Sequence, residues 1–213
     1  MMLWLTIQFL FAGLVLSDAS PMPEDCYQLV KPLSLTDHSM LSGTWYFIEG
    51  FTDHEPFKSR LKVLETTRVK MVLKPNNADV LQVFEEDKFN GICYGAKFSG
   101  PINGDIVTLT SGTHEMVFQL LPTCSDCMLV NSNITFFHYH QIEKMFDFPT
   151  TVGEDKFHTH SFYLMAKKAS VKEEDLQQFR KQAACVGFSG DPDYHYDPSK
   201  EFCAEGEGRQ ITV

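Results

Sequence analysis

The fold is decided by the stretch Gly43-Thr44-Trp45-Tyr46-Phe47-Ile48, which places a glycine and a tryptophan at the start of the first predicted β-strand. Gly43 allows a turn or a close backbone approach where a side chain would clash. Trp45 offers a large apolar plate with one N–H to satisfy, which suits the sealed end of a small closed sheet. Glycine and tryptophan also occur at this spacing around ordinary core tryptophans, so the interpretation depends on the rest of the chain.

A series of short strands comes next, separated by turn sequences such as Asn90-Gly91 and Asn103-Gly104. Apolar and polar residues alternate over 67–73, as in a strand with one buried face. The predicted strands are 44–51, 61–73, 80–89, 92–98, 106–111, 115–121, 127–140 and 157–166. We therefore expect an all-β fold, an eight-stranded antiparallel up-and-down barrel with room for one small ligand.

The residues around the strands predict one long helix and two short connections. Ser170-Val171-Lys172-Glu173 has the pattern of a capping box, and Leu176, Phe179 and Ala183 then share one face. We therefore expect one C-terminal α-helix packed outside the barrel. Ahead of the first strand, we expect an extended arm over 27–33 and a short 3₁₀ turn over 37–41.

Length and composition fit one domain with a leader and a tail. The 213 residues are 43% hydrophobic, enough for one barrel core. Residues 1–19 read as a secretory signal peptide, 20–186 as the barrel plus helix, and 187–213 as a tail tethered by Cys203. Six cysteines suit an oxidising compartment, so we expect a secreted, extracellular protein with no integral membrane association. Without residues 1–19 the net charge is −9 and no basic stripe is present, which argues against nucleic acid as a partner.

The chain resembles the lipocalins, and more narrowly their orosomucoid (alpha-1-acid glycoprotein) branch, which includes tributyltin-binding and saxitoxin- and tetrodotoxin-binding proteins of fish plasma. The resemblance covers nearly the whole chain after the leader. It is carried by Gly43 to Ile48, Cys26-Tyr27-Gln28-Leu29-Val30, Lys74-Pro75-Asn76, Cys93-Tyr94, Asn103-Gly104, Met165-Ala166-Lys167-Lys168 and Cys185. The lipocalin resemblance implies the same barrel, and it implies that Lys167 or Lys168 stacks on Trp45 at the closed end, a structural role beside Gly43.

Spacing alone leaves fifteen ways to pair the six cysteines. The resemblance implies the pairs Cys26–Cys185 and Cys93–Cys203. Cys124 and Cys127 have no counterpart in orosomucoid. Their C-x-x-C spacing occurs in redox motifs and in half zinc sites, but here it lies in a turn between strands, so we expect a local structural disulfide.

Inward positions of the barrel strands supply the candidate ligand-binding residues. The side chains that we expect to face the cavity are Phe47, Glu49, Met71, Leu73, Val83, Glu85, Ile106, Thr108, Val117, Leu129, Tyr163 and Met165. Orosomucoid has an arginine at the position of Thr108 and keeps a glutamate at that of Glu85. The resemblance therefore implies a more acidic cavity, and a preference for neutral or cationic amphiphiles over fatty acids. Because Glu85 and Glu86 are adjacent, only one can face inward, and an outward Glu85 is the alternative.

Two further patterns have ordinary and functional interpretations. Asn133-Ile134-Thr135 is the single N-glycosylation sequon, and a secreted chain would allow its use. The alternating pairs His138/His140 and His158/His160 could hold Zn²⁺ or Cu²⁺ or bind an organotin, or could simply form a polar outer face. We assign no metal.

The function that we expect is a monomeric plasma-type carrier of a small lipophilic or amphipathic ligand, with no cofactor and no enzymatic activity. An enzyme of the prostaglandin-isomerase kind would need a free thiolate facing the pocket. An immune-modulating scaffold with little ligand binding is a third possibility, and an apolipoprotein M-like sphingolipid carrier a fourth.

Overall fold

The computed structural model describes residues 24–146 and 154–211. The predicted signal peptide therefore lies outside the described residues. The helices are α1 Glu24–Leu29, η1 His38–Leu41, α2 Glu55–Val63, α3 Tyr139–Met145 and α4 Glu173–Cys185. The strands are β1 Gly43–Thr52, β2 Leu64–Lys74, β3 Asn77–Phe89, β4 Ile92–Asn103, β5 Ile106–Thr110, β6 His114–Leu121, β7 Cys127–Phe136, β8 Phe157–Ala166, β9 Tyr194–His195 and β10 Arg209–Gln210.

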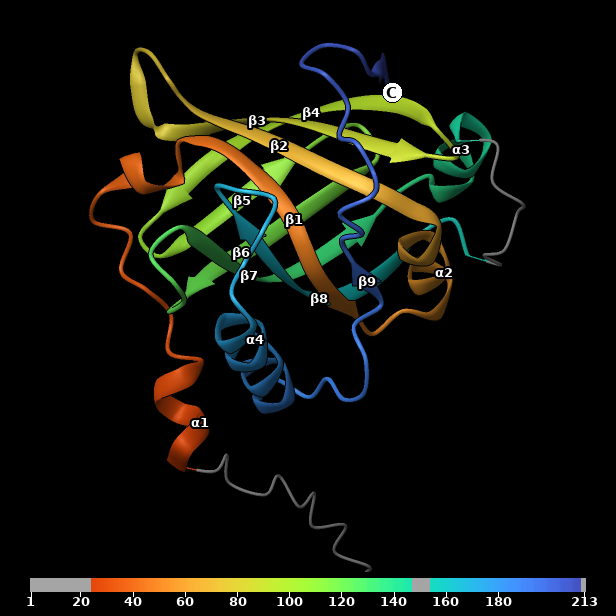
Figure 1. The fold of residues 1–213 in the computed structure, drawn as a ribbon. Coiled ribbons are helices and arrows are strands. Elements are labelled where there is room, and N and C mark those ends of the chain that lie inside the picture. The colour runs from red at the N-terminus through yellow and green to blue at the C-terminus, as the bar shows by residue number, and fades with distance from the viewer. Residues whose placement is uncertain (1–23, 147–153, 212–213) are drawn as a thin grey trace, which may run out of the picture.

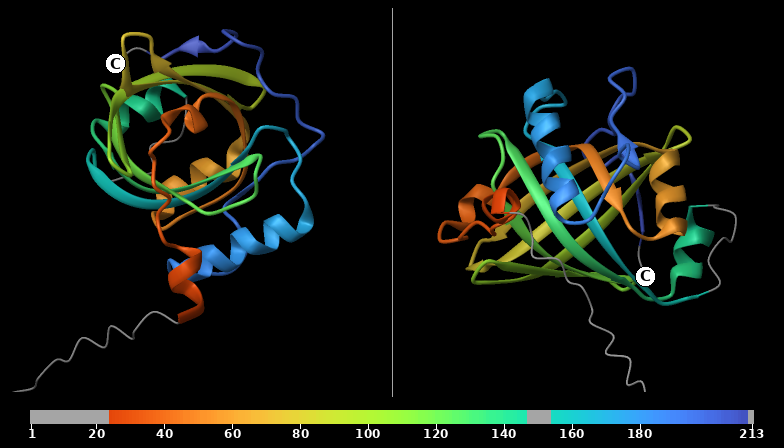
Figure 2. Two further views of the ribbon diagram at one scale, coloured as in Figure 1. Left: turned by 90° about the vertical axis from the view of Figure 1, so that its left-hand side faces the viewer. Right: turned by 90° about the horizontal axis from the view of Figure 1, so that it is seen from below.

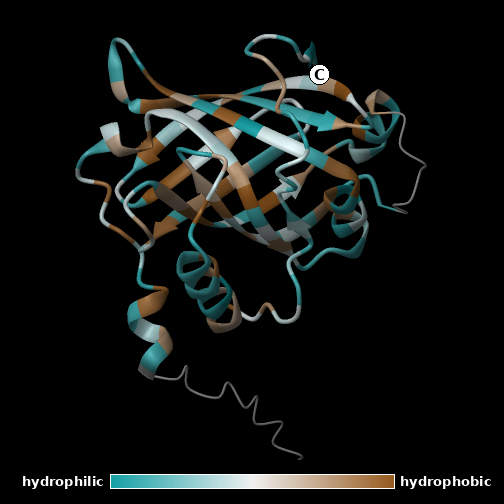
Figure 3. Ribbon diagram, in the orientation of Figure 1, coloured by the Kyte–Doolittle hydropathy of each residue, from teal (hydrophilic) through white to brown (hydrophobic). Residues whose placement is uncertain are grey.

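The strands β1 to β8 form the predicted closed barrel. Each pairs antiparallel with its neighbour in sequence, β8 closes the sheet onto β1, and β4 pairs with β5. Figure 2 shows the barrel end-on as a ring, with α4 lying outside it. Hydrophobic and hydrophilic segments alternate along the strands in Figure 3, as one face turned inward requires. The expected all-β up-and-down fold with an external C-terminal helix is confirmed.

Helix α4 packs its apolar face on the outside of β1, β7 and β8. Leu176, Phe179 and Ala183 are buried there against Phe162 and Leu164, and the Phe162 and Phe179 rings stack with centroids 5.4 Å apart. A disulfide between Cys26 and Cys185 joins α1 to the last turn of α4, so the helix is held at its C-terminal end as well as along its length.

Two of the predicted strands include residues that are helical in the structure. Residues 61–63, predicted as the start of a strand, belong to the helix α2, because Pro56 lies at its first turn and Phe57 and Leu61, four residues apart, are buried together. The predicted strand 127–140 ends at Phe136, since His138 adopts a left-handed conformation and α3 begins at Tyr139.

Two predictions about helices are also wrong, and one is confirmed. Lys172 is the N-cap of α4 and makes no side-chain cap bond, so Ser170 does not form the predicted capping box. The arm expected to be extended over 27–33 instead begins with the end of α1. The 3₁₀ turn is confirmed over 38–41, with the Asp37 side chain accepting a hydrogen bond from the Ser39 N–H.

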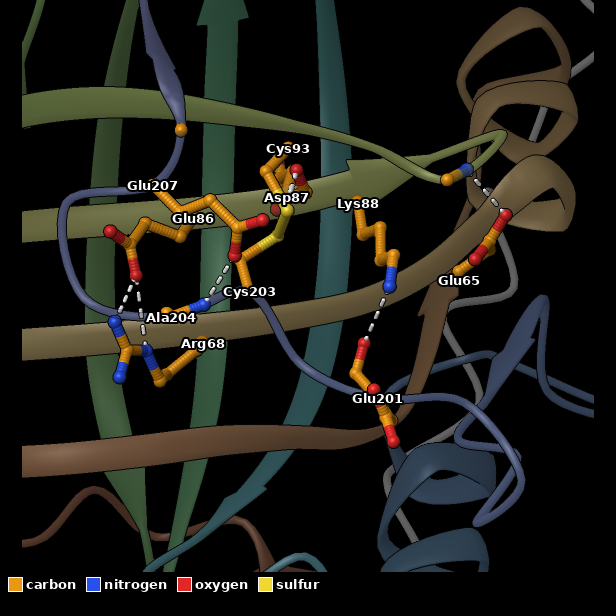
Figure 4. Close-up of a disulfide and its surroundings, with 12 residues drawn as sticks. Glu65, Arg68, Glu86, Asp87, Lys88, Cys93, Glu201, Cys203, Ala204 and Glu207 are labelled. Carbon is orange, nitrogen blue, oxygen red and sulfur yellow. Dashed lines mark hydrogen bonds and ion pairs between the residues drawn. A yellow bond between two sulfur atoms is a disulfide. The ribbon is translucent and has the colours of Figure 1, made fainter.

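The residues after α4 run back across the outside of the barrel. β9 pairs antiparallel with β1, and β10 pairs parallel with β4. Between them, the predicted disulfide joins Cys203 to Cys93 on β4, and the Lys88 ammonium donates to the Glu201 carbonyl at 3.1 Å (Figure 4). The tail is therefore fixed to the barrel wall along much of its length.

Short helices mark the two ends of the barrel. η1 lies at one end, and α2 and α3 lie together at the other (Figures 1 and 2). No helix within residues 24–146 and 154–211 is long and apolar enough to cross a membrane.

Candidate ligand-binding site

The end of the barrel beside η1 is sealed by Trp45. Its indole is buried and donates its N–H to the Leu41 carbonyl at 2.9 Å. The Lys167 ammonium lies 3.8 Å from the ring centroid and donates to the Ser42 carbonyl at 2.7 Å. Gly43 has φ +122°, and a Cβ there would lie 2.5 Å from the Lys167 Nζ, so glycine is required for this approach. The expected stacking of Lys167 on Trp45 is confirmed.

Above this seal, the barrel encloses a cavity of about 140 Å³. Most of its lining is aliphatic or aromatic, and it includes Phe47, Met71, Val83, Leu109, Phe118, Val130 and Met165. A second hollow of about 210 Å³ lies toward α3 and shares Arg60, Glu85, Asp87, Phe98 and His114 with the first. The interior is thus apolar near Trp45 and polar toward the α2 end.

The polar part of the cavity comes from three elements. Arg60 extends from α2, Thr67 from β2, and Glu85 and Asp87 from β3. The Thr67 hydroxyl donates to Asp87 Oδ1 at 2.6 Å, and Arg60 Nη2 lies 3.7 Å from Asp87 Oδ2. The Glu85 carboxyl lies close enough to the Asp87 carboxyl for the two to influence each other's pKa. Two β3 residues with the same orientation therefore place both acids opposite a single arginine.

Helix α2 holds Arg60 among aromatic rings. The guanidinium carbon lies 6.0 Å, 5.4 Å and 4.5 Å from the ring centroids of Phe57, Phe89 and Phe146. The arginine side chain is only 14% exposed. Cation–π contacts of this kind are strongest when the cation is shielded from water, so Arg60 is held in place by the rings as well as by Asp87.

Burial and the carboxyl pair set the protonation of this cluster. Burial, followed by repulsion from Asp87, raises the pKa of Glu85 well above its usual value. Burial also raises the pKa of Asp87, while Arg60 and the Thr67 hydroxyl act to lower it. Burial lowers the pKa of His114 to about 3, so this imidazole is neutral at physiological pH. The cluster therefore combines two carboxyl groups whose pKa values are both raised with the guanidinium of Arg60.

Six of the predicted inward residues lie at the cavity wall. They are Phe47, Met71, Val83, Glu85, Tyr163 and Met165. Among them, Glu85 faces inward and its neighbour Glu86 faces outward toward Arg68, which decides between the two alternatives for this pair.

Glu49 does not face the cavity, contrary to the prediction. The pairing of β1 with β8 shifts by one residue between Phe47 and Glu49, a β-bulge that turns Glu49 to the outer face. There it is fully buried, bonded to Arg180 of α4 at 2.5 Å and 3.0 Å and to His195 of β9 at 2.7 Å. The carboxylate fastens the helix and the tail to the barrel.

On β5, β6 and β7, the residues that face the cavity are offset by one position from those predicted. Ile106, Thr108, Val117 and Leu129 do not line the cavity, and the inward residues are Leu109, Met116, Phe118 and Val130. Ile106 is 42% exposed, while Leu129 is buried on the outer face beneath α4. Leu73 faces the barrel core but packs below the cavity rather than lining it. Both faces of these strands carry apolar residues, so the sequence pattern does not indicate which face points into the barrel.

Arg60 is the main cavity residue that the sequence analysis misses. The sequence analysis placed its segment in the connection before a strand, and so missed a cation that reaches into the cavity. Pro56 followed by Phe57 and Leu61 at helical spacing is the signal that could have identified the helix. Because Thr108 faces outward, its replacement of an arginine does not make the cavity more acidic; Arg60 supplies a cation from another element.

The four histidines of the two pairs do not form a common site. His138 and His140 both contact Asp155, whereas His158 bonds the Thr135 hydroxyl at 2.8 Å. The fourth, His160, bonds Asn131 at 2.6 Å. Among the described residues, the one group with metal-ligand spacing contains Cys93 and Cys203, which are joined as a disulfide.

All six cysteines lie in the described part of the chain and all are paired. Cys124 joins Cys127 across the turn before β7, as expected. Asn133 is exposed on the outer face of β7 and is accessible for modification.

Comparison with known proteins supports the same fold. No protein-family model matches the chain. Saxitoxin and tetrodotoxin-binding proteins 1 and 2 of Takifugu pardalis are 23% and 21% identical over 204 residues, 89% of this chain and 47% of each relative. The chain thus spans about half the length of the curated relatives it matches.

Two solved structures share the barrel. The siderocalin Ex-FABP, described as functioning through dual ligand specificities, has a TM-score of 0.52 at 14% identity, over 71% of this chain and 89% of that one. Odorant Binding Protein OBP1 has a TM-score of 0.50 at 16% identity, over 71% and 86% of the two chains.

Proposed function

From the lipocalin fold of this chain, we propose that the protein is a carrier that holds a small hydrophobic or amphipathic molecule inside the barrel and performs no chemistry on it. The observation that carries the proposal is the cavity itself, apolar beside Trp45 and polar at Glu85 and Asp87. Such a cavity suits a ligand with an apolar body and one polar group. Drug-like cations, organotins and small toxins all have this character, and the names of the two Takifugu relatives record toxin binding.

We also propose that the carrier works outside the cell as a secreted glycoprotein. The leader over 1–19 supports export, and three disulfides suit an oxidising environment. The exposed sequon at Asn133 supports glycosylation. N-terminal sequencing of the secreted protein should find a new end near Ser20; retention of the leader would instead favour the apolipoprotein M-like alternative.

The competing functions are disfavoured by different features. A thiol-dependent isomerase would need a free cysteine, and all six are in disulfides. A scaffold that binds no ligand would leave the cavity without a role, and uptake of a fluorophore into the barrel tests that function directly.

Trp45 provides the test of the carrier function. Once residues 1–19 are removed, it is the only tryptophan, because Trp4 leaves with the leader. We expect the neutral fluorophore N-phenyl-1-naphthylamine to enter the cavity, receive energy from Trp45, and be displaced by a ligand of the right class, with cationic drugs, tributyltin, guanidinium toxins and lysolipids as competitors.

The control compares two neighbouring residues of β3. Val83→Phe fills part of the cavity and should weaken uptake, whereas Phe84→Val changes an outward side chain and should leave it unchanged. If the unmodified protein takes up no fluorophore, the carrier proposal is wrong and the scaffold function is favoured.

A further inference from the structure

The barrel has a side opening between β4 and the turn that follows β5. Within the described residues, β4 pairs with β5 only from Ser99 to Asn103, and no ladder joins residues 92–98 to the turn over 111–114. The second hollow lies in this gap, because its lining includes residues from both sides of it. Lys97 on one side and Gly112 on the other are exposed, so the hollow reaches the surface between them.

The second hollow adjoins the ligand cavity, whereas helices occupy the nearby end of the barrel. Phe98 and His114 line both spaces. At the barrel end, Phe57 and Leu61 of α2 line the cavity, and the Phe146 ring of α3 packs on the guanidinium of Arg60. A ligand that left along the barrel axis would have to displace these helices, while a ligand that left sideways would pass through the second hollow.

The end of the tail lies at the outer margin of this opening. β10 pairs with β4 at Tyr94 and Gly95, and the Ile211 N–H donates to the Gly95 carbonyl at 2.8 Å. The Ile211 side chain lines the second hollow but not the cavity, and it packs against the apolar cluster that contains Tyr94 and Phe146. The tail therefore narrows the side opening from the β4 edge.

The tail is fixed firmly just before this contact and only lightly at it. The disulfide joins Cys203 to Cys93 on β4, next to the segment that leads to β10 (Figure 4). Residues 204–207 are exposed, and the ion pair of Glu205 with Lys70 is a surface contact that adds little stability. A short, exposed pairing such as that of β10 opens at low cost, and the disulfide keeps the freed strand close to its edge.

We propose that the ligand enters and leaves the barrel through this side opening, and that β10 is its gate, swinging from the fixed point at Cys203. When β10 leaves the β4 edge, Ile211 moves away from the second hollow and the ligand passes between β4 and the turn over 111–114. The gate sets the rate of exchange and not the affinity, because the tail is closed on the empty and on the loaded barrel alike. This inference rests on the proposed carrier function and specifies how its cavity is reached.

The first test opens the gate without changing the cavity wall. A Cβ added at Gly208 would lie 2.5 Å from the Gly95 backbone nitrogen, so Gly208→Ala should displace β10 from β4. Stopped-flow mixing of the mature protein with N-phenyl-1-naphthylamine gives the association and dissociation rates. We expect both to rise about tenfold, as when roughly one net backbone hydrogen bond is lost, with Kd unchanged. The control Ala204→Val enlarges an exposed residue of the same tail and should leave both rates unchanged.

The second test narrows the opening from its other side and keeps the native tail. Gly112→Phe places a ring beside the second hollow, and both rates should fall about tenfold while Kd stays the same, because only the barrier on the route is raised. The control Thr110→Phe changes an exposed residue that does not line the second hollow, and it should leave the rates unchanged.

Amide hydrogen exchange tests the gate in the unmodified protein. The Ile211 N–H is bonded only while β10 is docked on β4, so it should exchange faster than the amides of the β3–β4 ladder. Equal protection at the two places would overturn the gate, whether or not Gly208→Ala folds.

The outcomes separate this inference from the carrier proposal. Unchanged rates in Gly208→Ala would overturn the gate, and unchanged rates in Gly112→Phe would overturn the side route. A weaker Kd of Gly208→Ala at an unchanged association rate would also overturn the gate, since β10 would then stabilise the loaded barrel. In each of these cases the fluorophore still binds and the carrier proposal stands. If the unmodified protein binds no fluorophore, the carrier proposal fails, and with it the inference.

Discussion

The two faces of β3 use the same residue types for different purposes. On the inner face, Glu85 and Asp87 both line the cavity, and Arg60 is the arginine that pairs with Asp87 there. On the outer face, Glu86 pairs with Arg68 of β2 (Figure 4). Glu86 also accepts from the Gly206 N–H of the tail. Arg68 and Gly206 thus supply hydrogen-bond donors to Glu86. On the inner face, two carboxyl groups, those of Glu85 and Asp87, lie near one arginine.

This difference distinguishes a structural carboxylate from one that is available to a ligand. Burial alone does not do so, because Glu86 and Asp87 are both almost fully buried. The number of partners distinguishes the two kinds of carboxylate. A buried acid that has no cation partner within the fold must stay protonated or pair with a cation from a ligand.

The largest expected effect concerns the outer face, where Cys203 attaches the tail to Cys93. Replacing both with serine opens a loop of 110 residues, for which chain entropy predicts a loss of about 4–5 kcal/mol in the free energy of unfolding. The matched control, Cys124→Ser with Cys127→Ser, opens a separation of 3 residues and should lose only about 2 kcal/mol. Urea unfolding measures both, and equal losses would show that the disulfide of the tail contributes no more stability than the short one.

On the inner face, Arg60→Met should lower the free energy of unfolding by about 3 kcal/mol, because Asp87 is left as a buried charge without its cation. Methionine keeps an apolar side chain of similar length against Phe146. Adding Asp87→Asn to Arg60→Met removes the stranded charge and should recover part of the loss in urea unfolding. If the double variant is less stable than the single one by the full effect of Asp87→Asn, the two residues are not coupled.

The inner pair also predicts a pH dependence of opposite sign to that of an ordinary carboxylate. Glu85 keeps its proton in the folded protein above the unfolded pKa of about 4.3, so the folded state binds more protons and stability falls as pH rises. The slope is about 1.4 kcal/mol per pH unit until the raised pKa of Glu85 is passed.

The comparison of the unmodified protein with Glu85→Gln isolates this slope. His114 acts in the opposite direction between about pH 3 and 6.5, since its pKa is lowered, but it is present in both proteins. Urea unfolding at several pH values should give curves that diverge; parallel curves would mean that Glu85 is ionised in the folded protein.

The smallest expected effect is that of Glu86→Gln on the outer face. Glutamine keeps one oxygen that can accept from Arg68 and Gly206, so only the charge is lost and the free energy of unfolding should fall by about 1 kcal/mol. Unfolding in high salt should reduce the difference from the unmodified protein, because screening weakens the lost attraction.

The sequence predicted the barrel, the seal at Trp45 and the disulfides more fully than it predicted the cavity wall. The positions of the strands follow from the alternation of apolar and polar residues and from turn sequences, and both are local signals that span only a few residues. The direction of each side chain depends on register, and a single bulge at Ile48 reverses Glu49. Leu129 could not be assigned from its own strand, because α4 buries its outer face as thoroughly as the barrel buries its inner one.

The missed arginine has a similar cause. Arg60 reaches the cavity only because α2 lies at the end of the barrel, and that placement is a tertiary effect. The sequence left both an inward and an outward Glu85 open, and the structure decides for the inward one: β3 pairs on both sides in continuous register from Leu81 to Lys88.

The parallel pairing of β10 with β4 also affects how the molecule behaves in a crowded solution. Within the described residues, β5 pairs with β4 only from Ser99 to Asn103, so the first half of β4 would otherwise present free backbone groups. β10 covers this edge, and the close approach depends on Gly95 and Gly208, where an added Cβ would clash with the facing segment. An uncovered sheet edge is a template for pairing with another molecule. Cleavage of the tail before Gly208 would therefore turn a self-contained barrel into one that is prone to edge-to-edge aggregation.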